Sequence, residues 1–376
     1  MPPLSLLRAR TLSASVCLAL LILFVFSGHC LAADPLPGES ATVRDGATSI
    51  TVSAGAKYLA PQRYKGSDII TNAAGTKLAV ADISRPDAVF GPSVSIAAES
   101  EIGLEVPGLR QLRLVGEFSY SGGSARRSGV VDPGAGNFLI LLSVDPSYNW
   151  IGGIDKTIDG GATSRVSISQ DAFELRFGLE GKGDDWRPGS GAVTATPVFG
   201  AGLYASTQRY KVSTRYAAIT ASHSASMVET IRTTDIGPEV RAGMSFALPG
   251  GARVEALASA ALLVGWADLE ASQGLDTTIP LIAIKRSPTW SAKRSVNETL
   301  VSGLFGLTLR GDVPVAEKLS LGLEASGRLW TARPTIENPT SLYGTNNILT
   351  ATNEGVRIGQ DSASELGAAL RLRYSF

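Results

Sequence analysis

The sequence predicts an all-β fold: a closed antiparallel β-barrel that spans a membrane. Three observations predict it. Apolar and polar residues alternate with a period of two in many segments, most of these segments last about 9–11 residues, and short turns alternate with long polar stretches. The last segment shows the alternation most clearly, because Leu366 and Leu370 share one face whereas Glu365 and Arg371 share the other.

The polar face carries charge on nearly every predicted strand. A soluble β-sandwich shows the same alternation but turns its apolar face inwards. Every backbone N–H and C=O must be paired inside a membrane, so β-structure spans a bilayer only as a closed barrel. We therefore expect the apolar residues to face lipid and the polar residues to line the interior.

The predicted interior face carries both signs of charge. In a narrow barrel these groups would form an ion-pair ladder, and in a wider one they would line a water-filled channel. The mixture of signs favours a structural role over a sharply charge-selective pore. The candidate lumen-lining residues are Glu99, Glu101, Glu117, Arg113, Arg176, Glu239, Arg241, Arg253, Glu255, Glu324, Arg328, Arg371 and Arg373, with Glu105, Glu174, Glu365 and Arg310 on the same parity.

The number of strands is less directly readable. Ten alternating segments begin near residues 48, 91, 109, 166, 192, 231, 252, 298, 318 and 362. The run Phe138–Val144 is almost wholly apolar and would expose a costly apolar surface in a loop. We interpret it as one strand of an added hairpin that turns at Asp145-Pro146, which gives twelve strands, with ten as the alternative. Long polar stretches at 59–88, 209–230, 270–296 and 332–360 are predicted as extracellular loops, and the short turns as periplasmic.

Residues 1–33 have the features of a signal peptide, which leaves residues 34–376 as the barrel domain. Arg8 and Arg10 precede the apolar run Val16–Phe26, and the small residues Ala32 and Ala33 offer a cleavage site. We therefore expect the protein to be exported and the segment to be removed.

Aromatic residues are candidates for the girdles that anchor a barrel at the two membrane interfaces. Trp330 falls on the lumen-facing parity instead, which the alternation does not explain. The girdle candidates are Trp150, Trp266, Tyr58, Tyr120 and Tyr374.

The chain ends in Tyr374-Ser375-Phe376, after a strand with alternating apolar residues. This ending resembles the terminal strand of Gram-negative outer-membrane β-barrel proteins. The resemblance covers about the last ten residues and implies a class and a route. It implies location in the outer membrane, with outer-membrane lipid and the barrel-assembly machinery as partners.

The sequence indicates no catalytic, cofactor or metal site. Both cysteines, Cys17 and Cys30, lie in the predicted signal peptide, so we expect neither a disulfide nor a thiol site in the mature chain. His223 is the histidine that remains there, and we interpret it as a solvated loop residue. Enzymes of the outer-membrane class resemble one another in using a histidine base, often beside a serine, and the His-x-Ser spacing of one family fails because Ala225 occupies the serine position.

Two functions fit these observations. We favour a small-solute channel or uptake barrel. The alternative is a structural or surface-recognition barrel with a closed lumen, whose extracellular loops bind a surface ligand. The basic residues are scattered, so no nucleic acid is expected.

Overall fold

A computed structural model describes most of the chain after residue 47. The described ranges are 48–59, 65–66, 68–72, 77–81, 89–104, 106–131, 137–141, 144–145, 147, 152–155, 160–187, 193–220, 222–278, 290–338, 340–345, 348–353 and 355–376. The predicted signal peptide lies outside these residues. Within them, no helix is long and apolar enough to cross a membrane.

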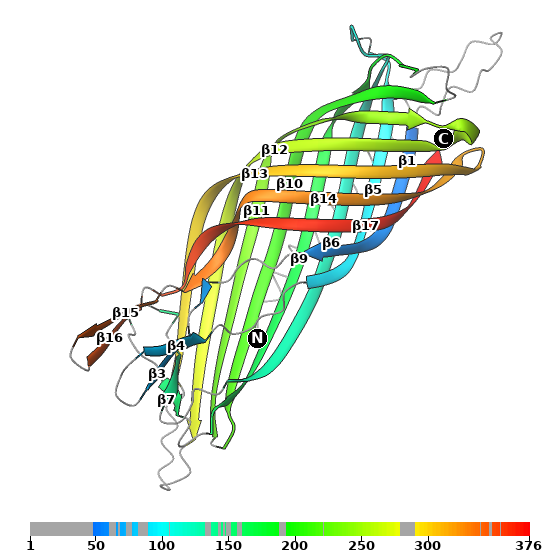
Figure 1. Cartoon of the computed structure of the whole chain (residues 1–376). Helices are drawn as coiled ribbons and strands as arrows, with labels where there is room; N and C mark the ends of the chain where they lie inside the picture. The colour runs from blue at the N-terminus through cyan, green and yellow to red at the C-terminus, as the bar shows by residue number, and fades with distance from the viewer. Residues whose placement is uncertain are drawn as a thin grey trace, which may run out of the picture.

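Ten long strands form a closed antiparallel ring (Figure 1). Each strand pairs with the next one of the ring, and the last pairs with the first through Ser49 and Ser375 up to Leu59 and Glu365. The predicted barrel is confirmed, with ten strands and not twelve. In chain order they are β1 (Thr48–Leu59), β5 (Val89–Ile102), β6 (Gln111–Val131), β9 (Ala162–Lys182), β10 (Thr194–Ala218), β11 (Ser222–Ala247), β12 (Arg253–Thr278), β13 (Trp290–Ala316), β14 (Leu319–Asn338) and β17 (Arg357–Ser375).

The apolar run at 138–144 does not add a hairpin to the ring. Residues Asn137–Leu141 form β7, which pairs with β3 (Asp68–Asn72) and β8 (Gly152–Asp155) in a separate sheet completed by β4 (Lys77–Ala81). The run lacks a period of two, so neither of its faces suits a wall between lipid and lumen. Its backbone pairs instead with another connection of the barrel, which sequence alternation does not reveal.

The separate sheet lies at the end of the barrel away from Phe376, and two further elements lie at this end as well (Figure 1). The hairpin of β15 (Thr340–Thr345) and β16 (Ile348–Asn353) interrupts the connection between β14 and β17. The short strand β2 (Lys65–Gly66) pairs in parallel with the end of β14. The other end carries the short turns: Ser375 N donates to Lys318 O at 2.9 Å, and Gly250 turns the β11–β12 connection with a φ of 80°.

Four of the strands, β10 to β13, are more than twice as long as a membrane requires. β13 has 27 residues, roughly 90 Å of strand, whereas about 9–11 residues cross the hydrocarbon layer. Residues 209–218 and 222–230, predicted as loop, continue β10 and β11, and the ends of the predicted loop at 270–296 belong to β12 and β13. These loop predictions were wrong, and the barrel wall extends well beyond the membrane.

The polarity of each long strand inverts along its length. On β11, Ile236 and Val240 face outwards and are exposed, whereas Ser226 shares their face farther along. On the inner face, buried Glu239 lies at one end and buried Ile231 farther along, although Glu229 beyond Ile231 is also buried. The apolar outer face suits lipid, and the apolar inner face suits a wall that stands in water.

The apolar belt is the band of large apolar side chains exposed on the outer wall. Tyr58, Tyr120 and Trp266 share its outward face near the end away from Phe376, and Tyr374 lies at the other end; Trp150 is outside the described residues. The belt consists of Val52, Val94, Phe173, Leu175, Phe177, Leu179, Phe199, Leu203, Ile236, Val240, Leu262, Val264, Val301, Phe305, Leu307, Leu309, Leu321, Leu323, Leu329, Leu366, Leu370 and Leu372.

Candidate functional site

The interior at the level of the apolar belt is crossed by an ion pair between opposite walls. Arg328 of β14 donates from Nη1 to Glu174 Oε1 of β9 at 2.6 Å, and four strands separate β14 from β9 in either direction around the ring. Lys57 Nζ lies 2.8 Å from Glu365 and 3.8 Å from Glu174. Both carboxylates are buried, so the cations offset a desolvation cost of several kcal/mol.

A second group of ion pairs centres on Arg310 of β13. Its Nε donates to Glu324 at 3.0 Å, its Nη1 lies 3.7 Å from Glu255, and its Nη2 lies 4.0 Å from Glu117 of β6. Strands β13 and β6 are also opposite one another in the ring. This group therefore ties the two walls together at a second place.

Arg176 of β9 connects this group to β11. It lies 3.6 Å from Glu117 and 3.5 Å from Glu239, and Arg241 lies 2.7 Å from the same Glu239. The carboxylates thus alternate with guanidinium groups along the lumen. Such alternation lets each buried charge meet an opposite one.

A further group lies towards the short turns. Arg371 is 3.1 Å from Asp312, and Glu99 is 3.2 Å from Arg113 and 3.1 Å from Arg373. A small cavity opens among these side chains, and its lining is Glu99, Arg113, Glu180, Lys182, Arg253, Glu255, Asp312, Arg371 and Arg373.

The structure brings together twelve of the thirteen candidate lumen residues in buried or half-buried positions. The other, Glu101, is exposed near the end of β5, where it accepts a hydrogen bond from Gln111 at 3.4 Å. Sequence reasoning missed Lys57 and Asp312. Lys57 lies on the same face of β1 as the buried Ser53, and this alternation could have identified it from the sequence. Asp312 was assigned to a turn instead.

A layer of aromatic and aliphatic side chains packs in the barrel interior next to the ion pairs. Trp330 and Tyr204 are buried in a cluster with Leu263 and Leu304, together with Ala261 and Ala363. The guanidinium carbon of Arg333 lies 4.5 Å from the centroid of the Trp330 ring. Trp330 therefore has the lumen-facing parity because it packs across the barrel interior, as a cation–π partner.

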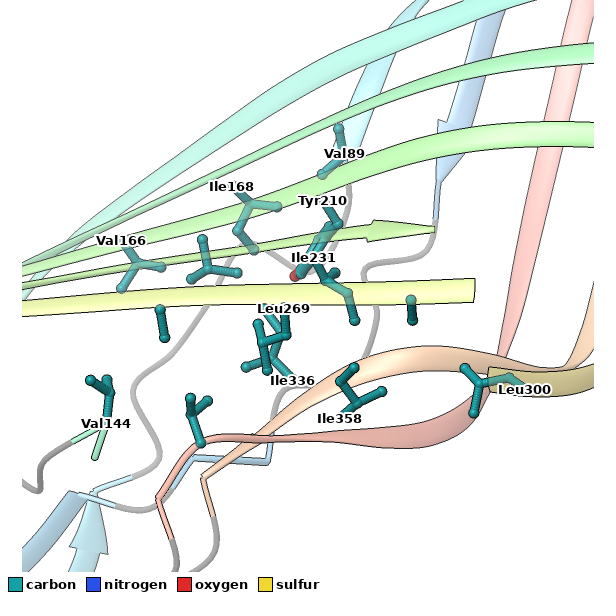
Figure 2. Packing of buried hydrophobic residues seen from close by; sticks show 14 of the residues in the cluster. Val89, Val144, Val166, Ile168, Tyr210, Ile231, Leu269, Leu300, Ile336 and Ile358 are labelled. Carbon is teal, nitrogen blue, oxygen red and sulfur yellow. The ribbon is translucent and has the colours of Figure 1, made fainter. Parts of the chain in front are cut away.

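Beyond that layer the barrel is filled by an apolar core (Figure 2). Wall residues such as Ile168, Tyr210 and Leu269 pack with Val144 and Val356, which come from two connections between strands. Val144 N donates to Gln273 Oε1 at 3.0 Å, and Val356 N donates to Val144 O at 3.0 Å. Both connections are therefore fastened inside the projecting part of the wall.

Side chains from opposite walls thus meet at several levels in the part of the chain that the structure describes. A small cavity beside Lys57 and Arg328 interrupts this packing. Its lining includes five serines: Ser53, Ser93, Ser95, Ser119 and Ser326. The arrangement holds the charges of the interior in pairs.

His223 is the second residue of β11 and pairs with Thr277 of β12, so its predicted position in a loop was wrong. The reason is the continuation of β10 and β11 beyond the membrane. Its side chain lies outside the described set.

No family model matches the chain, and no curated protein matches it. Among solved structures, it is similar to the outer membrane protease OmpT from Escherichia coli, with 10% identity, a TM-score of 0.37, and coverage of 90% of this chain and 99% of that one. It is also similar to the translocator domain of the autotransporter NalP from Neisseria meningitidis, with 12% identity, a TM-score of 0.30 and coverage of 98% of both chains. The P. putida toluene transporter TodX matches at 11% identity and a TM-score of 0.21, over 89% of this chain and 91% of that one.

These scores carry no inference about activity. The closed ring, the apolar belt and the charged interior are features of the protein itself, and they have the polarity that a lipid bilayer requires. The chain is an outer-membrane β-barrel.

Proposed function

We propose that the protein is a closed-lumen barrel whose projecting end recognises a ligand at the cell surface, and that it is not an enzyme. The observation that carries the proposal is the ion pair between Arg328 and Glu174, which joins opposite walls at the level of the apolar belt. A small-solute channel would need these charges to separate in a buried setting, which costs several kcal/mol per ion.

The length of the wall supports the recognition half of the proposal. Strands β10 to β13 have 25–27 residues, so about half of each stands beyond the apolar belt. The β15–β16 hairpin and the sheet of β3, β4, β7 and β8 lie at this end (Figure 1). A rigid wall with an apolar core provides a support that holds such elements away from the membrane.

Planar-bilayer recording tests the closed lumen. The wild-type barrel should give no stepwise conductance after insertion. A variant with Glu174→Ala, Arg328→Ala and Trp330→Ala removes the side chains at one level of the lumen. It should stay silent as well, because the Arg310 group and the apolar core still cross the interior. Stepwise conductance of the wild type would assign the protein to the channel class instead.

Surface recognition is tested with cells that display the protein over arrayed glycans and immobilised matrix proteins. Wild-type cells should bind at least one of these probes. Replacement of residues 340–353 by a short Gly-Ser linker should abolish that binding without changing the heat-modifiable mobility of the folded barrel. Failure of the displayed wild type to bind any probe would contradict the recognition half.

A further inference from the structure

The outer wall of β9, β10 and β11 carries five outward-facing basic side chains just beyond the apolar belt. We name them the basic patch. On β10 these residues share the outward face with the exposed Phe199 and Leu203 of the belt. The basic patch consists of Arg165, Arg209, Lys211, Arg215 and Arg232.

The register of the sheet places like charges directly opposite one another in this patch. Arg165 of β9 pairs with Arg215 of β10, and Arg209 of β10 pairs with Arg232 of β11. Residues directly opposite in an antiparallel pair have Cβ atoms about 4.5–5.5 Å apart, and like charges there destabilise the pair. Local features that act against stability are expected at functional sites.

Acidic side chains compensate only the Arg209–Arg232 pair, which lies nearer to the belt. Asp171 lies opposite Arg209, Asp268 lies opposite Arg232, and Glu270 is 3.2 Å from Arg232. The buried Nε atoms of Arg209 and Arg232 nevertheless have no hydrogen-bond partner among the described residues.

The Arg165–Arg215 pair, which lies farther from the belt, has no acidic residue directly opposite either arginine in the sheet. The other partner of Arg165 is Ser128, and the other partner of Arg215 is Ser226. An external anion between the two guanidinium groups would offset their repulsion and accept hydrogen bonds from both.

The wall beyond the belt is not basic all round. On β12 and β13 most outward residues at this height are acidic or neutral, and Lys293 of β13 is the basic exception; the others include Asp268, Glu270, Ser295, Asn297 and Thr299. The positive charge is therefore concentrated on one side of the barrel, as expected of a binding surface and not of general solubility.

The position of the patch indicates its partner. The belt ends at Phe173 of β9, which pairs with Thr207 of β10. Arg209 and Lys211 lie roughly 7 and 13 Å along the strand beyond Thr207, and Arg215 lies roughly 26 Å beyond it. The residues nearest the belt therefore stand beside the headgroups of the outer leaflet, and the Arg165–Arg215 pair lies farther out. We infer that the basic patch binds the phosphate groups of anionic lipid headgroups in that leaflet, with the arginines as bidentate donors.

Native mass spectrometry in a neutral detergent tests this inference with bisphosphorylated lipid A as the probe. The variant carries Arg209→Gln, Lys211→Gln and Arg215→Gln. Each basic residue near an anionic surface contributes about fivefold in binding, so the triple variant should bind on the order of 100-fold more weakly.

A matched variant removes the same charge elsewhere: Arg187→Gln, Lys293→Gln and Lys318→Gln, all exposed and outside the patch. It should bind lipid A like the wild type, and all three proteins should show the same heat-modifiable mobility. Equal weakening in both variants would overturn the inference, because the effect would then come from net charge alone.

Two further arms distinguish the source of the phosphate. Phosphatidylcholine should bind the wild type and the patch variant equally, and inorganic phosphate should not displace lipid A. Displacement by inorganic phosphate at the concentration of the lipid would overturn the assignment to a headgroup. The patch lies on the outer wall, so its test does not depend on whether the lumen conducts.

Discussion

Arg328 and Glu174 form an ion pair across the full width of the barrel, with Arg328 Nη1 2.6 Å from Glu174 Oε1. Their strands are as far apart in the ring as ten strands allow. A contact of this kind needs a narrow barrel and long side chains from both walls. It fixes the interior in a way that pairs between neighbouring strands do not.

Removing one partner of this pair should destabilise the barrel strongly. Glu174→Ala leaves two cations, Arg328 and Lys57, to share Glu365 in a buried setting, and the uncompensated charge costs about 3–5 kcal/mol in the free energy of unfolding. Urea titration in micelles, followed by tryptophan fluorescence, measures the change. The double variant Glu174→Ala/Arg328→Ala should lose less than the sum of the single variants, and strict additivity would show that the two residues do not interact.

The inversion of polarity predicts opposite responses to the same substitution on β13. Leu307 faces lipid and is exposed, so Leu307→Arg should cost about 2–4 kcal/mol of unfolding free energy near the bilayer midplane. Asn297 shares that face beyond the belt, so Asn297→Arg should change stability by less than about 0.5 kcal/mol. Equal costs at the two positions would contradict the placement of the membrane boundary.

Trp330 and Trp266 provide a matched pair of tryptophans. Trp330 is 1% exposed in the lumen, and Trp330→Ala should cost about 3–5 kcal/mol because it leaves a cavity and removes a partner of Arg333. Trp266 is 50% exposed on the outer wall. Trp266→Ala should be much milder by denaturant titration, and the reverse order would place Trp330 outside the packed interior.

The turn between β9 and β10 contains a titrating group outside the membrane. The Thr196 hydroxyl donates to Asp185 at 2.7 Å and, with the Arg110 guanidinium, holds the pKa of the Asp185 carboxyl below its usual range. The stabilising contribution is therefore present above the ordinary pKa of an aspartate and is lost as the pH falls through the lowered one. Thr196→Val should raise the pKa of Asp185 in a carboxyl NMR titration, and an unchanged titration would show that this hydrogen bond does not form in solution.

The sequence predicts the membrane-spanning part of the fold because lipid and lumen impose opposite polarities on neighbouring residues. Leu366 and Arg371 reveal their faces without any structure, and the ten strand positions follow within a few residues for most strands. The interior charges are predictable for the same reason. Which of them pair across the barrel is not, because the Arg328–Glu174 contact depends on ring size.

The projecting wall escaped prediction because its polarity is reversed. Lys211 and Arg215 on the outer face of β10 are interpreted as loop residues when an apolar outer face is expected. The buried Tyr210 and Val212 on either side of Lys211 nevertheless keep the period of two. The apolar run at 138–144 was wrongly assigned to the barrel wall because its side chains are apolar. Its backbone pairs with β3 and β8 in a separate sheet.

Thiol labelling of the lumen tests the closed interior most directly, because residues 34–376 contain no native cysteine. Ser206 is 4% exposed on the inner face of β10, and Ser295 is exposed on the outer face of β13. In folded, reconstituted protein a charged thiosulfonate should label Ser295→Cys rapidly and leave Ser206→Cys unreacted until the barrel is unfolded. Rapid labelling of Ser206→Cys in the folded barrel would show a water path through the lumen and contradict the closed interior.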